Sequence, residues 1–438
     1  MKTILKLSKP GLLAAAFAAS NPLSASPSAA TVIDVAPGAG QFESAVKSAV
    51  PGDVLKLKAG IHDGPVLIEK ALTIEGEDGA IVDGHGVGRT IEITAPGVSI
   101  RHLRITGSGM ALDQMHAGVF LSKAASGGTV EDSVIEDNLV GVYVHGAHDA
   151  LVRRNRIAGR VLPHLNDCGN GVYLWNAPGT KVEDNDITGG RDGIFTNGSR
   201  QNVFARNRLH AVRFAIHYMY TNDSEVSDNI SIGNHAGYVI MYSARLKIRN
   251  NVSEDDRDHG LLFNFANGSD ISGNAVRGGE KCLFIYNANK NKFHGNWFEG
   301  CRLGIHFTAG SEGNAMSDNA FIGNQTQVMY VGTRFLNWSE KGRGNYWSDN
   351  PAFDLNGDGI ADEAYRPNDI IDQIIWRYPA AKLLLNSPAT QVVRWAQSQF
   401  PGLHPGGVID KAPLMKPPGI KAADAFKGAP KLAGGEWR

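Results

Sequence analysis

Two methionines and one histidine recur at a fixed spacing near the middle of the chain and could bind a soft metal ion. His217 and Met219 lie in the phrase Ala215–Met219, and Met241 ends the related phrase Gly237–Met241, 22 residues later. If both phrases are strands stacked in one sheet, alternation places all three side chains on the same outer face. Thioether sulfur and imidazole nitrogen suit Cu(I) far better than a hard cation. His217, Met219 and Met241 are therefore the main candidate copper ligands.

Two weaker copper candidates follow from the same pattern. His306 and Met329 occupy the third position of consecutive later phrases, and Met115 and His116 are adjacent in an insertion. The alternative for each residue taken singly is a packed outer surface, because like residues stack favourably on neighbouring strands. Aromatic residues fill that position in other phrases, namely Phe120, Tyr143, Tyr173 and Phe195.

An aspartate-rich segment near the C-terminal end matches the first nine positions of a calcium-binding loop. Its oxygen ligands would come from the side chains of Asp354, Asn356, Asp358 and Asp362 and from the carbonyl of Ile360. The twelfth position is Tyr365 instead of the glutamate of an EF-hand. We expect a structural calcium ion here, and a Gly/Asp turn without metal is the alternative.

The elements that position these residues follow from two repeating columns. Small residues open phrases from Gly118 to Gln327, mostly 22 or 23 residues apart, and a second column from Ser133 to Asn319 is filled mainly by asparagine at the same intervals. About this many residues form one coil of a three-sided parallel β-helix, whereas helical-hairpin repeats are longer. Asparagine tolerates left-handed turns, and its amide can bond to its counterpart one coil away. The sequence therefore predicts an all-β solenoid with an asparagine ladder.

Two insertions interrupt the repeat, and both leave the solenoid at the same edge. The first, Ser108–Gln114, leads to Met115 and His116, and the second is Val161–Cys168. Loops that protrude from a rigid scaffold often carry function. The three cysteines, Cys168, Cys282 and Cys301, are an odd number, so at least one thiol is unpaired. Cys282 stands where other phrases have glycine, which indicates a small buried side chain.

The chain divides into five segments by composition. Residues 1–30 have basic, apolar and small-residue regions in the order of a secretory signal peptide, and residues 31–349 carry the β-helix pattern. Residues 350–366 hold the calcium-loop-like segment, 367–400 form a mixed C-terminal cap, and 401–438 read as an extended tail. An amphipathic helix is expected to cap the first coil, with one face formed by Phe42, Ala45, Val46 and Val50.

Charge and hydropathy exclude two classes of partner. Three of the 43 Lys and Arg residues lie in the signal peptide, which leaves 40 against 44 Asp and Glu, a formal charge of −4. That balance gives no sign of a nucleic-acid partner. After the signal peptide, no apolar run approaches the roughly 18 residues of a membrane span. We therefore expect an exported chain with no membrane span of its own.

Several long phrases closely resemble the NosD family, among them RFAIHYMYTNDSEVSDN, GNHAGYVIMYSARL, GRGNYWSDNPAFDLNGDGIADEAYRPND and FPGLHPGGVIDKAPLM. The resemblance runs from about Thr31 to Met415. It implies a periplasmic, right-handed parallel β-helix of the pectin-lyase-like kind that docks on the membrane subunit of an ABC transporter. It further implies work with a lipoprotein copper chaperone and nitrous-oxide reductase, in which copper is received and delivered without turnover of an organic substrate. It supplies no ligand list, so the ligands named above come from the outward-facing positions.

The alternative function is a secreted β-helix polysaccharide lyase or hydrolase, or a carbohydrate-binding protein. Such an enzyme needs carboxylates placed together on one face. The densest acidic group is Asp255, Asp256 and Asp258 beside His259, and we expect it to be a solvated, salt-bridged turn. No nucleophile elbow, phosphate loop or HExxH motif occurs, so we assign no catalytic residue.

Overall fold

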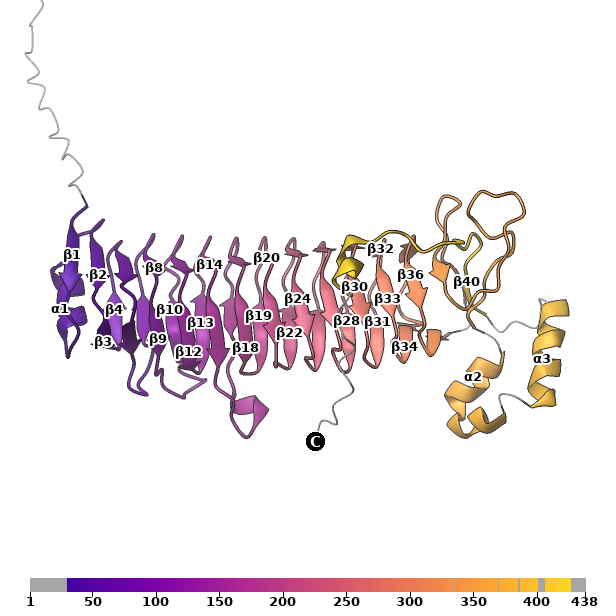
Figure 1. Ribbon diagram of the computed structural model, residues 1–438, viewed down its shortest axis with the longest axis horizontal. Coiled ribbons are helices and arrows are strands. Elements are labelled where there is room, and N and C mark those ends of the chain that lie inside the picture. The colour runs from indigo at the N-terminus through magenta and orange to yellow at the C-terminus, as the bar shows by residue number, and fades with distance from the viewer. Residues whose placement is uncertain (1–29, 333, 369, 385–386, 401–405, 427–438) are drawn as a thin grey trace, which may run out of the picture.

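The computed structural model describes residues 30–332, 334–368, 370–384, 387–400 and 406–426 (Figure 1). The expected signal peptide lies outside the described residues except for Ala30. Within them, three parallel sheets form the three sides of one long solenoid, and most coils contribute one short strand to each sheet. The predicted parallel β-helix is confirmed.

The strands of each sheet follow one another at regular intervals along the chain. The first sheet contains β1 (Val32–Val35), β2 (Val54–Leu57), β5 (Thr73–Gly76), β8 (Ser99–Arg101), β11 (Thr129–Glu131), β14 (Leu151–Arg153), β17 (Lys181–Glu183), β20 (Val203–Ala205), β23 (Glu225–Ser227), β26 (Lys247–Arg249), β29 (Asp270–Ser272), β32 (Lys292–His294) and β35 (Ala315–Ser317). The second contains β4 (Val66–Ile68), β7 (Ile91–Ile93), β10 (Ala117–Leu121), β13 (Val140–His145), β16 (Val172–Trp175), β19 (Asp192–Asn197), β22 (Phe214–Met219), β25 (Ala236–Met241), β28 (His259–Asn264), β31 (Lys281–Tyr286), β34 (Leu303–Thr308) and β37 (Thr326–Val331). The third contains β3 (Gly60–Asp63), β6 (Ala80–Asp83), β9 (Arg104–Thr106), β12 (Val134–Asn138), β15 (Arg156–Gly159), β18 (Asp186–Gly189), β21 (Arg208–His210), β24 (Ile230–Ile232), β27 (Val252–Glu254), β30 (Ala275–Arg277), β33 (Trp297–Glu299), β36 (Ala320–Ile322) and β39 (Tyr346–Trp347).

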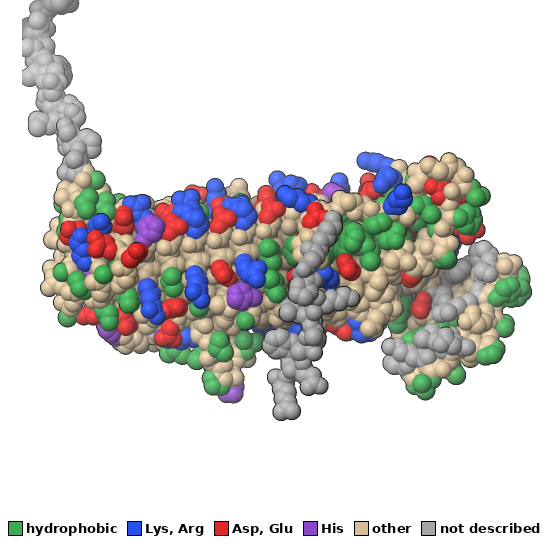
Figure 2. All heavy atoms as spheres, in the orientation of Figure 1, with side chains coloured by type: hydrophobic (Ala, Val, Ile, Leu, Met, Phe, Trp, Pro, Cys, Tyr) green, Lys and Arg blue, Asp and Glu red, His purple; other side chains and the backbone are tan. Residues whose placement is uncertain are grey.

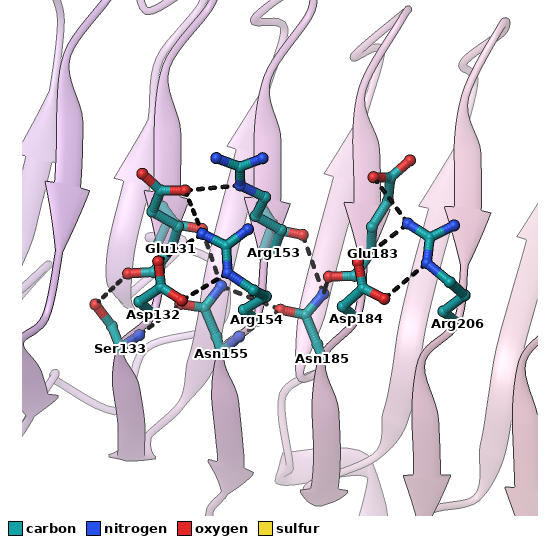
Figure 3. A network of polar contacts seen from close by, with 12 residues as sticks. Glu131, Asp132, Ser133, Arg153, Arg154, Asn155, Glu183, Asp184, Asn185 and Arg206 are labelled. Atoms are coloured by element: carbon teal, nitrogen blue, oxygen red, sulfur yellow. Dashed lines mark hydrogen bonds and ion pairs between the residues drawn. The ribbon is translucent and has the colours of Figure 1, made fainter.

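The asparagine ladder is confirmed and runs through the interior of the solenoid. The Ser133 backbone N–H donates to Asn155 Oδ1 at 3.1 Å, and the Asn155 side-chain amide donates to Asn185 Oδ1 at 3.1 Å (Figure 3). The same contact repeats from coil to coil and ends one coil beyond the predicted column, where Asn319 donates to Asn345 Oδ1 at 2.9 Å. Outside the ladder, ion pairs join successive coils, such as Arg154 with Asp132 (Figure 3).

A helix caps the first coil, whereas the C-terminal helices lie beyond the last coil and carry hydrophobic side chains at their surface (Figure 2), with Leu383, Leu384 and Val392 exposed. At the N-terminal end, α1 (Gln41–Ser48) buries Phe42 and Val46 against the first coils, as expected, while Val50 lies after the helix and is exposed. At the other end, α2 (Ile370–Arg377), a 3-10 turn η2 (Pro379–Leu384) and α3 (Pro388–Gln399) form a hairpin beyond the last coils (Figure 1). None of the helices in the described ranges is long and apolar enough to cross a membrane.

Residues 406–426 return to the solenoid, in contrast to the expected extended tail. Strand β40 (Gly407–Ile409) pairs with β38 (Phe335–Asn337). A terminal 3-10 turn, η4 (Lys421–Phe426), packs against β27 and β30, where Phe426 and Ile420 join Val252 and Ala275 in one buried cluster. These apolar contacts are made far along the chain, so the local Pro, Gly and Lys composition did not reveal them.

Two of the three cysteines form a disulfide between neighbouring coils. Cys282 and Cys301 are bonded and buried, and Cys168 is a free, buried thiol. This agrees with the expectation that at least one thiol is unpaired and that Cys282 is buried.

Candidate functional site

The outward residues of the second sheet form two straight columns. The central column contains Phe120, Tyr143, Tyr173, Phe195, His217, Val239, Leu262, Phe284, His306 and Met329. The edge column contains His145, Trp175, Asn197, Met219, Met241, Asn264 and Tyr286. Met219 and Met241 are register partners on adjoining strands, which lie about 4.8 Å apart. His217 precedes Met219 by two residues on the same face, so the structure brings the three main candidates together.

The imidazole of His217 is held by a buried carboxylate from the preceding coil. Its Nδ1 lies 3.1 Å from Oδ2 of Asp192, which is fully buried. Arg213 donates to both oxygens of the same carboxylate, at 2.8 and 2.7 Å. Because a carboxylate only accepts, His217 carries its proton on Nδ1 and leaves the Nε2 lone pair free. A carboxylate that accepts the proton of one ring nitrogen in this way orients a histidine whose other nitrogen binds a metal.

The free nitrogen of His217 has no other use within the described part of the chain. Its Nε2 atom is buried and has no hydrogen-bond partner there. The residue is only 7% exposed, and a buried polar atom without a partner normally costs stability. An electron-pair acceptor such as a metal ion would satisfy it.

Asp192 stays ionised in this setting. Burial alone would raise the pKa of Asp192, but hydrogen bonds from His217 and Arg213 outweigh burial and hold that pKa below its usual value. The carboxylate therefore keeps accepting the Nδ1 proton at neutral pH, and the orientation of the imidazole is maintained.

Apolar groups surround the three donors. The His217 ring lies 4.8 Å from the ring of Phe195 and 5.1 Å, edge to face, from that of Phe214, measured between centroids. Met241 packs on the cluster of Phe214, Ala236, Val239, Leu262 and Phe284. Both methionines are half-buried. Water is thus partly excluded from a group of soft, uncharged donors, which is the environment that favours Cu(I).

His306 and Met329 are also register partners, as the spacing indicated. Burial lowers the pKa of His306, with further lowering by Lys281 and Arg302, so the imidazole is neutral at pH 7. Its Nδ1 is buried without a hydrogen-bond partner among the described residues. Two donors beside two positive charges hold a cation less well than the three donors at His217, so this pair remains the weaker candidate.

Met115 and His116 lie elsewhere, at a small pocket between the two insertions. The pocket has a volume of about 160 Å³ and is lined by residues of both insertions, including Leu112, Met115, His116 and Cys168. The prediction that the insertions leave the same edge is therefore confirmed. His116 Nδ1 accepts the backbone N–H of Ala111 at 3.1 Å, so this nitrogen is already occupied.

The calcium-loop-like segment folds into consecutive turns closed by its own side chains. Asp354 accepts the N–H groups of Gly357 and Gly359, Asn356 accepts that of Asp358, and Asp362 accepts that of Leu355. Over the described ranges, no three His, Cys, Asp or Glu side chains lie close enough together to hold a metal. Asp354, Asn356, Asp358, Ile360 and Asp362 therefore remain a predicted calcium site.

The acidic group near His259 is not the solvated turn that we expected. Asp256 is 1% exposed, and its carboxylate accepts the hydroxyls of Ser231 and Ser253, both at 2.6 Å, and the Asn234 N–H at 2.8 Å. It replaces an asparagine in a second internal ladder, so hydrogen bonds to the scaffold occupy both oxygens. The other part of the group pairs Asp258 with His259 at 2.9 Å, and burial lowers the pKa of His259 to about 4.

Sequence reasoning missed two residues of these sites. Asp192 falls one residue before a phrase-opening glycine, and only its diagonal contact with His217 across adjoining strands reveals its role. Cys168 lies in the second insertion, and the sequence does not reveal that it lines a pocket with Met115 and His116 of the first. A search for carboxylates one coil before each candidate histidine would have found Asp192.

Known proteins resemble this chain in sequence and in fold. Residues 158–352 match the family model described as "Periplasmic copper-binding protein (NosD)". The chain is 37% identical over 378 residues to a protein of Stutzerimonas stutzeri and 39% identical over 376 residues to one of Pseudomonas aeruginosa, both named "Probable ABC transporter binding protein NosD". Each alignment covers 83% of this chain, and 87% and 88% of the two relatives.

Solved structures share the fold at low sequence identity. The A-module of the mannuronan C-5 epimerase AlgE6 of Azotobacter vinelandii matches with a TM-score of 0.53 and 14% identity, over 66% of this chain and 90% of that chain. Pectate lyase Pel9A matches with a TM-score of 0.43 and 15% identity, over 75% and 82%. At this identity the likeness extends to the parallel β-helix alone. The sequence relatives, by contrast, match over most of their length and include the strands that carry His217, Met219 and Met241, and on that ground the chain belongs to the NosD family of periplasmic copper-binding proteins.

Proposed function

We propose that this protein receives Cu(I) in the periplasm and delivers it during assembly of the copper centres of nitrous-oxide reductase. The observation that carries the proposal is the His217 imidazole, fixed by Asp192 at Nδ1 and unpartnered at Nε2 in the described chain, beside the register pair Met219 and Met241. Copper is cargo in this proposal and not a resident cofactor.

The donor set fits transfer better than permanent storage. Two thioethers and one imidazole are neutral ligands, so the bound Cu(I) ion keeps its positive charge and gains no thiolate bond. Both methionines are half-buried, which leaves their outer side open to ligands of a partner. Copper can then leave by stepwise ligand exchange while His217 stays fixed. We accordingly propose a carrier without enzymatic turnover.

The proposed partners are the membrane subunit of an ABC transporter, a lipoprotein copper chaperone and nitrous-oxide reductase. The names of the two relatives support the first, since both are described as binding proteins of an ABC transporter. The hairpin α2–η2–α3 is the surface that we propose for this contact. It leaves apolar side chains in solvent, with Leu383 92%, Val392 62% and Ile374 42% exposed. Exposed apolar groups of this kind mark protein contacts.

Copper titration of a packing-conserving variant tests the proposed site. His217→Phe introduces the residue type of Phe195, its register partner on the preceding strand. Met219→Leu with Met241→Leu keeps the side-chain volume while removing sulfur. The triple variant should lose one equivalent of Cu(I), measured anaerobically by competition with a chromophoric chelator. Met110→Leu is a matched control, because Met110 is exposed and lies outside this face. Unchanged affinity and stoichiometry in the triple variant would refute the site.

A further inference from the structure

The two insertions enclose a pocket whose chemistry the outer-face site does not use. The first insertion supplies Leu112, Met115 and His116, and the second supplies Cys168. Tyr143 and Tyr173 of the central column lie at its base, and Arg191 lines it from the next coil. Parts of the chain more than 50 residues apart thus converge on a space of about 160 Å³.

The size of the pocket excludes most organic ligands. Sites for drug-sized molecules usually measure about 300–1,000 Å³. A space of about 160 Å³ admits a small molecule or a hydrated ion, so the donor types of the lining decide between them. Met115 also packs against the buried cluster of Ala117, Phe120, Val140 and Tyr143, so its thioether is held in place at the wall.

The pocket lining lacks charged oxygen donors, because no Asp or Glu stands among the described residues that line it. Its metal-binding side chains are one thiol, one thioether and one imidazole, beside the neutral oxygens of Asn170, Tyr143 and Tyr173. Hard cations such as Ca²⁺ and Mg²⁺ require oxygen ligands, whereas thiolate with thioether selects Cu(I). Cys168 is also the free cysteine of the described chain, because Cys282 and Cys301 are bonded to each other.

We propose that this pocket is a second Cu(I) site, with Cys168 Sγ and Met115 Sδ as ligands and the imidazole of His116 as the third. The inference rests on the proposed function only in taking Cu(I) as the ion. Binding forms a copper–thiolate bond and releases the thiol proton to water, so the ion and its thiolate together are neutral. Because the Ala111 N–H already occupies Nδ1, His116 would bind the metal through Nε2.

The surrounding charges are compatible with a neutral copper–thiolate unit. The Nε atom of Arg191 lies 4.0 Å from Oδ2 of Asp192, the carboxylate that also holds His217. Arg191 therefore faces the pocket on one side and an acidic residue on the other. Through Asp192, the pocket lies next to the outer-face site, which is two strands from Tyr173 along the central column, roughly 10 Å at the usual strand spacing.

A thiolate site differs from the outer-face site in its spectrum as well as its position. Anaerobic Cu(I) titration of the full chain should reach two equivalents, with a thiolate-to-copper absorption band in the ultraviolet that accompanies one of them. Cys168→Ser should abolish the band and remove one equivalent. Met115→Leu, which conserves volume, should weaken that equivalent at least tenfold. Met110→Leu is the matched control from the same insertion; Met110 contacts Arg160 and does not line the pocket, so this variant should behave as wild type.

The two sites fail separately. If Cys168→Ser keeps both the absorption band and the stoichiometry of wild type, the pocket site is wrong, whatever the outer-face variant does. If the triple variant at His217, Met219 and Met241 binds as much Cu(I) as wild type while Cys168→Ser loses the bound copper, the pocket site is supported and the outer-face site is refuted. Circular dichroism of each variant checks the fold, and Met115→Leu keeps the test decisive should Cys168→Ser fail to fold.

Discussion

His217 Nδ1 and Asp192 Oδ2 lie 3.1 Å apart, on neighbouring strands of the second sheet. The contact joins an outward imidazole to a carboxylate that is fully buried, and it determines which ring nitrogen remains free. Neither residue alone would mark a metal site. Together with Met219 and Met241 they give one oriented nitrogen and two sulfur atoms on a single face.

Replacing Asp192 by Asn should weaken copper binding without removing a ligand. The amide can donate to Nδ1 of His217, which moves the imidazole proton to Nε2 and blocks the lone pair that would bind copper. Loss of the hydrogen-bond partner of a metal-binding histidine typically costs about 10- to 100-fold in metal affinity. Chelator competition with Cu(I) measures the change. Asp270→Asn is the control, since Asp270 forms a comparable pair with the exposed His294 on the first sheet; equal affinities in the two variants would contradict the role of Asp192.

The repeat predicts the strands of the scaffold, whereas polar contacts outside the repeat could not be predicted from the sequence. Ile216 and Tyr218 are fully buried and Met219 faces out, as strand alternation predicts. A shift of the strand register by one residue would exchange the inner and outer faces, so the hydrophobic pattern fixes the register. The contact of Asp192 with His217 joins adjoining coils, but other coils have other residue types at these two positions, so no repeat marks it. The contact of Asp410 with Asn345, 65 residues away, depends on where the C-terminal segment returns, which composition does not encode.

Asp410→Ala should destabilise the C-terminal end of the solenoid strongly. Asp410 is fully buried and ends the asparagine ladder: it accepts the Asn345 N–H at 2.6 Å, the Trp347 Nε1–H at 2.9 Å and the Ala412 N–H at 3.1 Å. Each buried donor left without an acceptor costs about 1–3 kcal/mol, so for three donors we expect a loss of roughly 3–9 kcal/mol in chemical denaturation. Asp318→Asn, which removes the charge from the exposed pair with Arg343 and keeps a residue type that tolerates the φ of 54° at this position, should cost less than about 1 kcal/mol. Similar losses in both variants would argue against this role of Asp410.

Asp256→Asn should change how stability depends on pH. Burial raises the pKa of Asp256 to about 6, above its ordinary value of 3.8. The folded state thus binds the extra proton between about pH 4 and 6, so this group makes the wild type lose stability as pH rises through that window. The variant lacks this loss and should be more stable at pH 7 by roughly 3 kcal/mol, with the difference shrinking towards pH 4. Urea denaturation at both pH values measures it, and parallel pH profiles would refute the assignment.

Leu383→Ser with Val392→Ser should weaken binding to the transporter membrane subunit and leave copper binding unchanged. Both side chains are largely exposed, so their removal costs little folding stability, but it deletes apolar area from the proposed contact. Co-purification with the membrane subunit gives the readout. Leu355→Ser is the control, because Leu355 is 84% exposed at the same end of the molecule but outside the hairpin. Retention of full binding by the double variant would exclude the hairpin, and binding to protein-free lipid vesicles instead would assign it to the membrane surface.

If the aspartate-rich loop binds calcium, the ion should stabilise the packing of the C-terminal segment against the solenoid. The loop is tied to that segment by backbone bonds, from Met415 N to Gly359 O at 3.0 Å and from Ala361 N to Pro413 O at 2.8 Å. An ion that orders Asp354, Asp358 and Asp362 therefore also fixes residues 413–415. We expect Ca²⁺ to slow proteolysis of the C-terminal segment and to raise the thermal midpoint, Mg²⁺ to do neither, and Asp358→Ala to abolish both effects. Each carboxylate oxygen has a second lone pair, so Asp354 can bind the ion while it accepts the two backbone N–H groups of the loop. A chain whose proteolysis is the same in Ca²⁺ and in a calcium chelator would show that the loop is a metal-free turn.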